Sequence, residues 1–263
     1  MTLAATDPII RADRLSRDFR NLKGERIEAI GEVSFDVPHG AFISIVGPSG
    51  CGKSTLLRIV AGLLAPRGGN IFLQGQPVTG PSREIGMIFQ SPVLLPWRTV
   101  LANVMLPAQV LKLPPSQYEQ RAHDLLRLVG LNGFEDSYPH ELSGGMAQRA
   151  AIVRALVHDP AILLADEPFG ALDAMTREQM NTEFQRIWME SGKTILFVTH
   201  SIAEAVFLSD IVLVLSGRPS RVLDVVEVDF PRARDIDVMG TDRFGDYTKR
   251  IRAHFAASAA VEL

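Results

Sequence analysis

The chain has 263 residues, of which 46% are hydrophobic and 22% are charged, and its formal net charge is -3. These values are near the globular average and argue against a disordered chain, while the lack of excess Lys and Arg argues against nucleic acid as a partner. A single cysteine, Cys51, excludes an intramolecular disulfide and a cysteine-based metal centre. Residues 1–14 have no apolar signal-peptide core, and no run reaches the roughly 20 apolar residues of a membrane-spanning helix.

Strand and helix patterns alternate along most of the chain. Segments 9–46 and 69–78 predict short strands joined by turns, which we expect to form an antiparallel side sheet. Runs that are apolar on both faces predict buried strands of a parallel sheet at 43–46, 85–89, 161–165, 194–199 and 211–215. Helical patterns lie between them at 53–64, 116–129, 146–158 and 177–191. This alternation predicts an α/β fold with a mostly parallel sheet.

Segment 91–140 interrupts the alternation. It is either a long surface excursion or a packed helical subdomain inserted into the α/β core. Ser116 and Glu119 have the spacing of a capping box at the start of a helix. The apolar side chains that follow form one stripe, made of Ala122, Leu125, Leu126 and Val129. Such a stripe needs a partner surface, so we favour the packed subdomain.

Residues 47–54 read GPSGCGKS and match the phosphate-binding pattern G-x-x-x-x-G-K-[ST]. The glycines let backbone N–H groups converge on phosphate oxygens, and the following helix N-terminus favours an anion. Lys53 supplies positive charge to the β- and γ-phosphates, and the Ser54 hydroxyl is expected to bind Mg²⁺. The strand–loop–helix setting argues against an ordinary glycine-rich turn. We expect ATP to contact Gly47, Pro48, Ser49, Gly50, Cys51, Gly52, Lys53, Ser54 and Thr55.

Two carboxylates, Asp166 and Glu167, follow the apolar run 161–165. At the end of a buried strand, Asp166 can reach the coordination sphere of Mg²⁺. Glu167 can then polarise the attacking water as a general base. On its own the pair could be two solvated loop acids. Beside a phosphate loop, the residues favour ATP hydrolysis.

Four further features resemble ABC ATPases. Residues 142–146, LSGGM, resemble the signature motif, and residues 171–173, ALD, resemble the D-loop. Gln90 resembles the Q-loop glutamine and His200 the switch histidine, each after a predicted strand. The motifs follow the family's order over residues 40–215. The resemblance implies the ABC ATPase fold, a P-loop NTPase core. It also implies the following division: a nucleotide-binding core with the β side sheet at 1–90 and 160–220, a helical subdomain with the signature at 91–159, and a tail at 221–263.

The resemblance also implies a mechanism. Two subunits, expected to be identical, pack head to tail, and each ATP lies between the phosphate loop of one and the signature motif of the other. Gln90 contacts Mg²⁺ and the attacking water, His200 contacts the γ-phosphate, and Asp173 belongs to the nucleotide site. Loss of the γ-phosphate opens the dimer. The signature motif offers that phosphate a hydroxyl, backbone N–H groups and a helix N-terminus, which come from Ser143, Gly144 and Gly145.

Two positions are less typical of the family. An aromatic side chain normally stacks on adenine, and Phe19 is the candidate; the alternative is a core phenylalanine of the side sheet. Met146 replaces the glutamine that is usual in the signature motif. Methionine cannot donate a hydrogen bond to nucleotide, but the Ser-Gly-Gly core remains, so we expect activity to survive.

Segments 89–100, 166–177 and 216–219 narrow the resemblance to bacterial nitrate/sulfonate/taurine importer ATPases. Importers of thiamine pyrimidine precursors share these patterns and stay open as an alternative. The resemblance implies transmembrane permease subunits and, indirectly, a periplasmic or lipid-anchored substrate-binding protein. It implies a peripheral position on the cytoplasmic face of the inner membrane.

Segment 90–115 is expected to dock the permease. Leu94, Leu95 and Trp97 are candidates for a groove that accepts a short permease helix; alternatively, they belong to the core of the helical subdomain.

Several rival classes fit the sequence less well. ABC ATPases that act on chromosomes usually contain a long coiled coil, for which 91–140 is too short. Translation-associated members carry two cassettes in one chain, and exporters often fuse the cassette to a membrane domain. An interaction protein with an inactive site is disfavoured because Lys53, Asp166, Glu167 and His200 are all present.

Overall fold

The computed structural model describes residues 7–20 and 23–259. These residues form two compact units. The first unit comprises residues up to 82 and from 194 onward, and the second comprises residues 83–193. Among the described residues, no helix has both the length and the apolar character needed to cross a membrane.

The first unit contains two groups of strands. An antiparallel sheet has the order β2-β1-β4-β5, with β1 at Ile10–Arg20, β2 at Arg26–Val37, β4 at Gly68–Leu73 and β5 at Gln76–Pro77. It confirms the predicted side sheet, except that segment 43–46 belongs to the other group. In that group β3 (Phe42–Val46) pairs in parallel with β8 (Thr194–Val198) and β9 (Ile211–Leu215), and β10 (Val222–Glu227) is antiparallel to β9.

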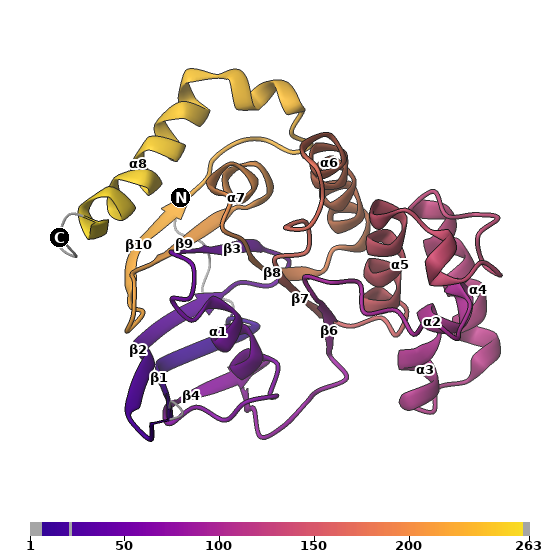
Figure 1. The fold of residues 1–263 in the computed structure, drawn as a ribbon, viewed down its shortest axis with the longest axis horizontal. Helices are drawn as coiled ribbons and strands as arrows, with labels where there is room; N and C mark the ends of the chain where they lie inside the picture. The colour runs from indigo at the N-terminus through magenta and orange to yellow at the C-terminus, as the bar shows by residue number, and fades with distance from the viewer. Residues whose placement is uncertain (1–6, 21–22, 260–263) are drawn as a thin grey trace. The chain divides into compact units, whose positions relative to one another are not determined.

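Helices cover the parallel strands of the first unit. They are α1 (Lys53–Val60), α7 (Ile202–Leu208) and α8 (Asp242–Ala259), with a 3-10 helix, η2, at Ile236–Gly240. α7 packs on β3, and α8 lies against α7 and β10 (Figure 1). Strands β3 and β8 are buried along their whole length, which explains their apolar character on both faces. Phe42 and Phe197 pack in this core with ring centroids 5.8 Å apart.

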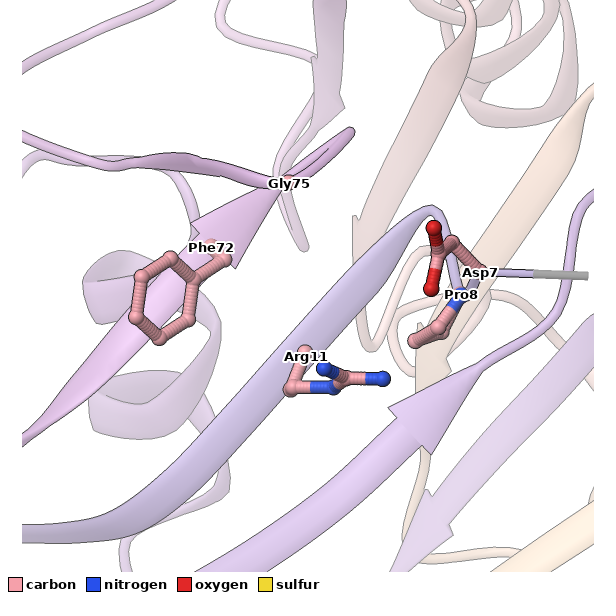
Figure 2. A pocket seen from close by; sticks show the side chains of 5 residues that line it. All are labelled: Asp7, Pro8, Arg11, Phe72 and Gly75. Carbon is pink, nitrogen blue, oxygen red and sulfur yellow. The ribbon is translucent and has the colours of Figure 1, made fainter.

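A small cavity of about 260 Å³ lies on the side sheet (Figure 2). It is lined by Asp7, Pro8, Arg11, Phe72 and Gly75. The Arg11 Nε also lies 3.4 Å from a carboxylate oxygen of Asp36 on the neighbouring strand β2. None of the residues predicted to bind nucleotide lines this cavity.

The second unit joins a strand pair to a set of helices. β6 (Ile85–Ile88) pairs in parallel with β7 (Ile162–Asp166), so the carboxyl ends of both strands lie at the same edge. The helices are α2 (Val100–Val104), α3 (Leu106–Val110), α4 (Pro115–Leu128), α5 (Gly144–Leu156) and α6 (Ala174–Ser191), with a 3-10 helix, η1, at Pro139–Glu141. α5 packs against β6 and against α2, α3 and α4 (Figure 1).

The apolar stripe predicted on α4 is packed inside the second unit. Ala122, Leu126 and Val129 are buried, and Leu125 is partly buried. Segment 91–140 is therefore packed, as predicted, and is not a surface excursion.

The predicted capping box at Ser116 and Glu119 is wrong. The helix begins at Pro115, its N-cap is Pro114, and no side chain caps it. Proline is favoured at a first helical position, because its φ angle is already helical and it has no N–H to satisfy. The residues that do cap helices in this unit are Thr99, Ser143 and Asp173.

Candidate active site

The phosphate loop connects the carboxyl end of β3 to α1 in the first unit. Gly52 is the N-cap of α1 and has a φ of 115°, which L-residues with a side chain rarely adopt. A methyl group placed there would also lie 3.0 Å from the Ala29 carbonyl oxygen. The loop therefore requires glycine at this position in order to hold the start of α1 against β2.

Lys53 is buried at the start of α1, with 5% of its surface exposed. Its Nζ donates hydrogen bonds to the carbonyl oxygens of Gly47 (2.9 Å) and Pro48 (3.1 Å). The ammonium is thus held within the loop, where the amino end of α1 adds further positive potential. Ser54 and Thr55 follow in the first turn and are partly exposed. This arrangement suits an anionic ligand.

Cys51 also belongs to the loop, and it is buried with 1% of its surface exposed. Burial raises the pKa of its thiol, and the positive charges of Lys53 and Arg218 act in the opposite direction. Burial therefore has a larger effect on the pKa of this thiol than the nearby positive charges have.

His200 lies next to the phosphate loop in the fold of the first unit. It follows β8, and the Thr199 N–H donates to the Ile45 carbonyl of the neighbouring strand β3 at 3.2 Å. Because β3 continues into Gly47, His200 and the loop emerge at the same edge of adjacent parallel strands. The His200 side chain is exposed there.

Glu204 was not predicted to belong to the site, but it supports the residues beside His200. Its buried carboxylate accepts a hydrogen bond from the Thr199 hydroxyl, and that hydroxyl accepts one from the Ser201 N–H at 3.0 Å. The Ser201 hydroxyl in turn caps the Glu204 N–H at 3.3 Å. The Ser-x-x-Glu spacing of a capping box could have indicated this arrangement.

Phe19 lies on β1 and is 41% exposed. The Arg17 guanidinium lies over its ring at 5.3 Å. The interpretation of Phe19 as a core residue is therefore wrong, and stacking on adenine stays a prediction.

In the second unit, Gln90 and Glu167 come together. They follow the parallel strands β6 and β7, in which Ile88 is opposite Ala165. A methyl group placed on Gly170 would lie 3.5 Å from Nε2 of Gln90 and 3.7 Å from Oε2 of Glu167. An amide and a carboxylate thus converge on one point, as is needed to orient a water molecule.

Glu167 has a φ of 45°, in the left-handed region that residues with a side chain rarely adopt. Such backbone strain persists only where the surroundings fix it. Its carbonyl accepts from the Gly170 N–H at 3.1 Å. Arg177 holds the following loop by donating to the carbonyls of Phe169 (3.3 Å) and Leu172 (2.9 Å). Asp166, which precedes Glu167, is partly exposed at the end of β7.

The signature motif begins α5. The Ser143 hydroxyl caps this helix by accepting the Met146 N–H at 3.3 Å. A methyl group placed on Gly145 would lie 3.1 Å from Cγ2 of Thr176, so this glycine allows the close approach of α5 to the start of α6. Ser143 and Gly144 are exposed. The motif therefore presents a hydroxyl and the free N–H groups of a helix N-terminus to solvent.

Asp173 caps α6. Its carboxylate accepts from the hydroxyl (2.7 Å) and the N–H (3.1 Å) of Thr176, and these hydrogen bonds lower its pKa. The contact of Asp173 with nucleotide stays a prediction.

Comparison with known proteins identifies the family. The ABC transporter model matches residues 30–170, a segment that includes the phosphate loop, Gln90, the signature motif and the acid pair. The taurine import ATP-binding protein TauB of Rhizobium johnstonii is 44% identical over 93% of this chain and 95% of its own. The aliphatic sulfonates import ATP-binding protein SsuB of Bacillus cereus is 39% identical over 90% of this chain and 92% of its own.

A solved structure agrees with this assignment. The dimeric post-hydrolysis state of the ATP-binding cassette MJ0796, bound to ADP and Pi, matches 84% of this chain and 100% of its own with a TM-score of 0.73 and 31% identity. The fold, the motifs and the relatives together show that this chain belongs to the ABC transporter family and is an ATP-binding, ATP-hydrolysing cassette.

Proposed function

We propose that this cassette powers the uptake of taurine, an aliphatic sulfonate or a related small organic solute. The names of the TauB and SsuB relatives support this class of solute over the thiamine-precursor and non-transport alternatives. The observation that carries the motor role is the convergence of the Gln90 amide and the Glu167 carboxylate at Gly170. The proposal includes a helical subdomain at 91–159 that carries the signature motif.

Each site residue has a role in this proposal. Lys53 neutralises the β- and γ-phosphates, and Glu167 accepts the proton of the attacking water. Gln90 orients that water, and His200 contacts the γ-phosphate. Phe19 stacks on adenine.

Mg²⁺ fits the donors present. A hydroxyl oxygen from Ser54 and a carboxylate oxygen from Asp166 are the hard ligands that this ion takes, and Mg²⁺ commonly completes its shell with substrate phosphates and water. Gln90 adds an amide oxygen. When bound, the ion neutralises charge on the phosphates.

Two copies of the chain are proposed to act as a head-to-tail homodimer. The exposed Ser143 and Gly144 at the start of α5 support this, because they are available to the γ-phosphate bound by a second subunit. The dimeric state of the MJ0796 cassette is consistent with such an arrangement.

The permease is proposed to dock on the loop after Gln90. Trp97 is 71% exposed and Val93 is 56% exposed, while Leu94 and Leu95 are partly exposed. The interpretation of Trp97 as a core residue is therefore wrong. A hollow of about 280 Å³ begins two residues further along the chain, and its lining within 99–119 includes Leu101, Met105, Ala108 and Leu113. The cassette is proposed to lie at the cytoplasmic face of the inner membrane. A substrate-binding protein is proposed to act on the opposite side of that membrane.

The docking loop is held firmly within the second unit. The buried Asn103 amide donates to the carbonyls of Leu95 (3.1 Å) and Arg98 (3.0 Å). Arg154 of α5 donates to the carbonyls of Pro92 (2.8 Å) and Val93 (2.7 Å). A movement of this loop can therefore be transmitted to α5, the helix that begins at the signature motif.

Replacing Trp97 by alanine is expected to weaken binding of the permease by at least about tenfold, because large exposed aromatic side chains dominate such interfaces. Co-purification with the co-expressed permease measures this. Leu63→Ala is the matched control, since Leu63 is an apolar residue of the first unit with 54% exposure. Equal permease recovery with both variants would contradict the docking surface.

The solute is tested by uptake into vesicles that contain the permease, this cassette, ATP and the binding protein. We expect ATP-dependent accumulation of taurine or an alkanesulfonate. Accumulation of a thiamine pyrimidine precursor instead would reject the proposed solute and keep the motor role.

A further inference from the structure

The hairpin at 216–221, between β9 and β10, packs beside the phosphate loop. It is tied to β2, because the Ser220 N–H donates to the Ala29 carbonyl (3.1 Å) and the Gly31 N–H donates to the Ser220 carbonyl (3.0 Å). The Ser216 N–H closes the hairpin by donating to the Arg221 carbonyl at 2.9 Å. A methyl group placed on Gly52 would lie 3.5 Å from the Ser220 hydroxyl oxygen. These contacts therefore hold the hairpin against the phosphate loop.

The Arg218 side chain extends from this hairpin to the phosphate loop. Its Nε donates a hydrogen bond to the Gly50 carbonyl, 168 residues away in sequence. A methyl group placed on Gly50 would lie 3.4 Å from the Arg218 Nη2. The guanidinium is therefore in direct contact with the outer side of the phosphate loop.

The Gly50–Cys51 peptide group is held at both ends. Its carbonyl accepts from Arg218, and its N–H donates to the Pro48 carbonyl at 3.2 Å. The same Pro48 carbonyl accepts from the Lys53 Nζ at 3.1 Å. A continuous set of hydrogen bonds thus leads from Arg218, through one peptide group and one carbonyl, to the Lys53 ammonium. Because a trans peptide is planar, fixing its carbonyl also fixes the direction of its N–H.

We propose that Arg218 is a positioning residue of the nucleotide site, which fixes the shape of the phosphate loop and adds positive charge to it. Arg218 suits this role better than a role in stability. It is exposed, and a single exposed arginine contributes little to folding. Its guanidinium contacts the Gly50 carbonyl, which places a positive charge directly on the loop. The inference rests on ATP binding by the cassette and is independent of the transported solute.

The test compares Arg218→Gln, Arg218→Lys and Arg221→Gln in the full chain. Arg221 is a matched control because it is exposed on the same hairpin but lies beside Gly31, with its Nε 3.8 Å from a methyl group placed there. Affinities for ATP, ADP and adenosine are measured by calorimetry, and Tm by scanning calorimetry. Measurable ATP binding by the wild type separates a failure of this inference from a failure of the proposed nucleotide site.

We expect Arg218→Gln to weaken ATP and ADP binding about tenfold, as for the loss of a hydrogen bond from a charged donor, with adenosine binding unchanged. Arg218→Lys should recover part of the loss, because it keeps the charge but not the planar donor group. Arg221→Gln should stay within about twofold of wild type, since it removes neither contact. The proposal would be overturned if Arg218→Gln bound ATP as tightly as Arg221→Gln does.

A second measurement separates positioning from a general loss of folding. The Tm of Arg218→Gln should stay close to that of Arg221→Gln, because both arginines are exposed, while the affinity for ATP differs between the two variants. If Arg218→Gln unfolds, Arg218→Lys decides the matter: unchanged ATP affinity in that variant would overturn the role of the guanidinium, and a selective loss for ATP and ADP would support it.

Discussion

Replacing Glu167 by glutamine is expected to lower the rate of ATP hydrolysis by about 10²–10⁴-fold while ATP binding is retained. The Glu167 carboxylate and the Gln90 amide converge on Gly170, and the backbone of Glu167 is held in the left-handed region. Glutamine keeps the size and the polar character of the side chain but cannot accept the proton of the attacking water. The phosphate loop and Lys53 are unchanged, so binding of ATP should persist.

Purified Glu167→Gln and wild type are compared by phosphate release and by size-exclusion chromatography with and without ATP. Because the γ-phosphate is not cleaved, we expect the variant to accumulate as an ATP-bound dimer. Glu190→Gln is the control, since Glu190 is an exposed residue of α6 that pairs with Arg186. Near-wild-type turnover by Glu167→Gln would remove the general-base role.

Replacing Arg234 by leucine is expected to reduce the free energy of unfolding by about 3–5 kcal/mol. Arg234 is only 4% exposed and donates to the carbonyls of Val206 (2.8 Å), Phe207 (2.9 Å) and Ser209 (2.9 Å). These carbonyls lie at the end of α7, beyond the reach of the helix's own N–H groups, and leucine would remove this buried donor from all three. Burial lowers the pKa of Arg234 to about 10, so the side chain is still charged at pH 7.

Urea unfolding at pH 7 measures this loss. Arg243→Leu is the matched control, because Arg243 pairs with Asp229 at the surface and is 52% exposed. We expect it to cost less than about 1 kcal/mol. Equal losses for the two variants would show that Arg234 does not act as the cap of α7.

The elements near the phosphate loop follow from local sequence. A run that is apolar on both faces predicts a buried strand wherever it occurs, and 211–215 matches β9 at both ends. The phosphate loop needs glycine and lysine at fixed spacing, followed directly by a helix. The strand predicted at 161–165 is observed at Ile162–Asp166, so each end differs by one residue. Helix ends were less predictable. The helix after the loop stops at Val60, not at residue 64, because Gly62 takes a φ of 70°.

The sequence alone determined the buried strands and the strand–loop–helix setting of residues 47–54, since apolar runs and the spacing of glycine and lysine are local features. Only the tertiary structure decided that Phe19 and Trp97 are exposed and that Cys51 is buried. It alone placed the Arg218 side chain on Gly50, and Arg234 on the end of α7. The physical reason is that a periodic pattern indicates that a face will be buried, but the partner of that face, and of any charged side chain, is set by segments distant in sequence.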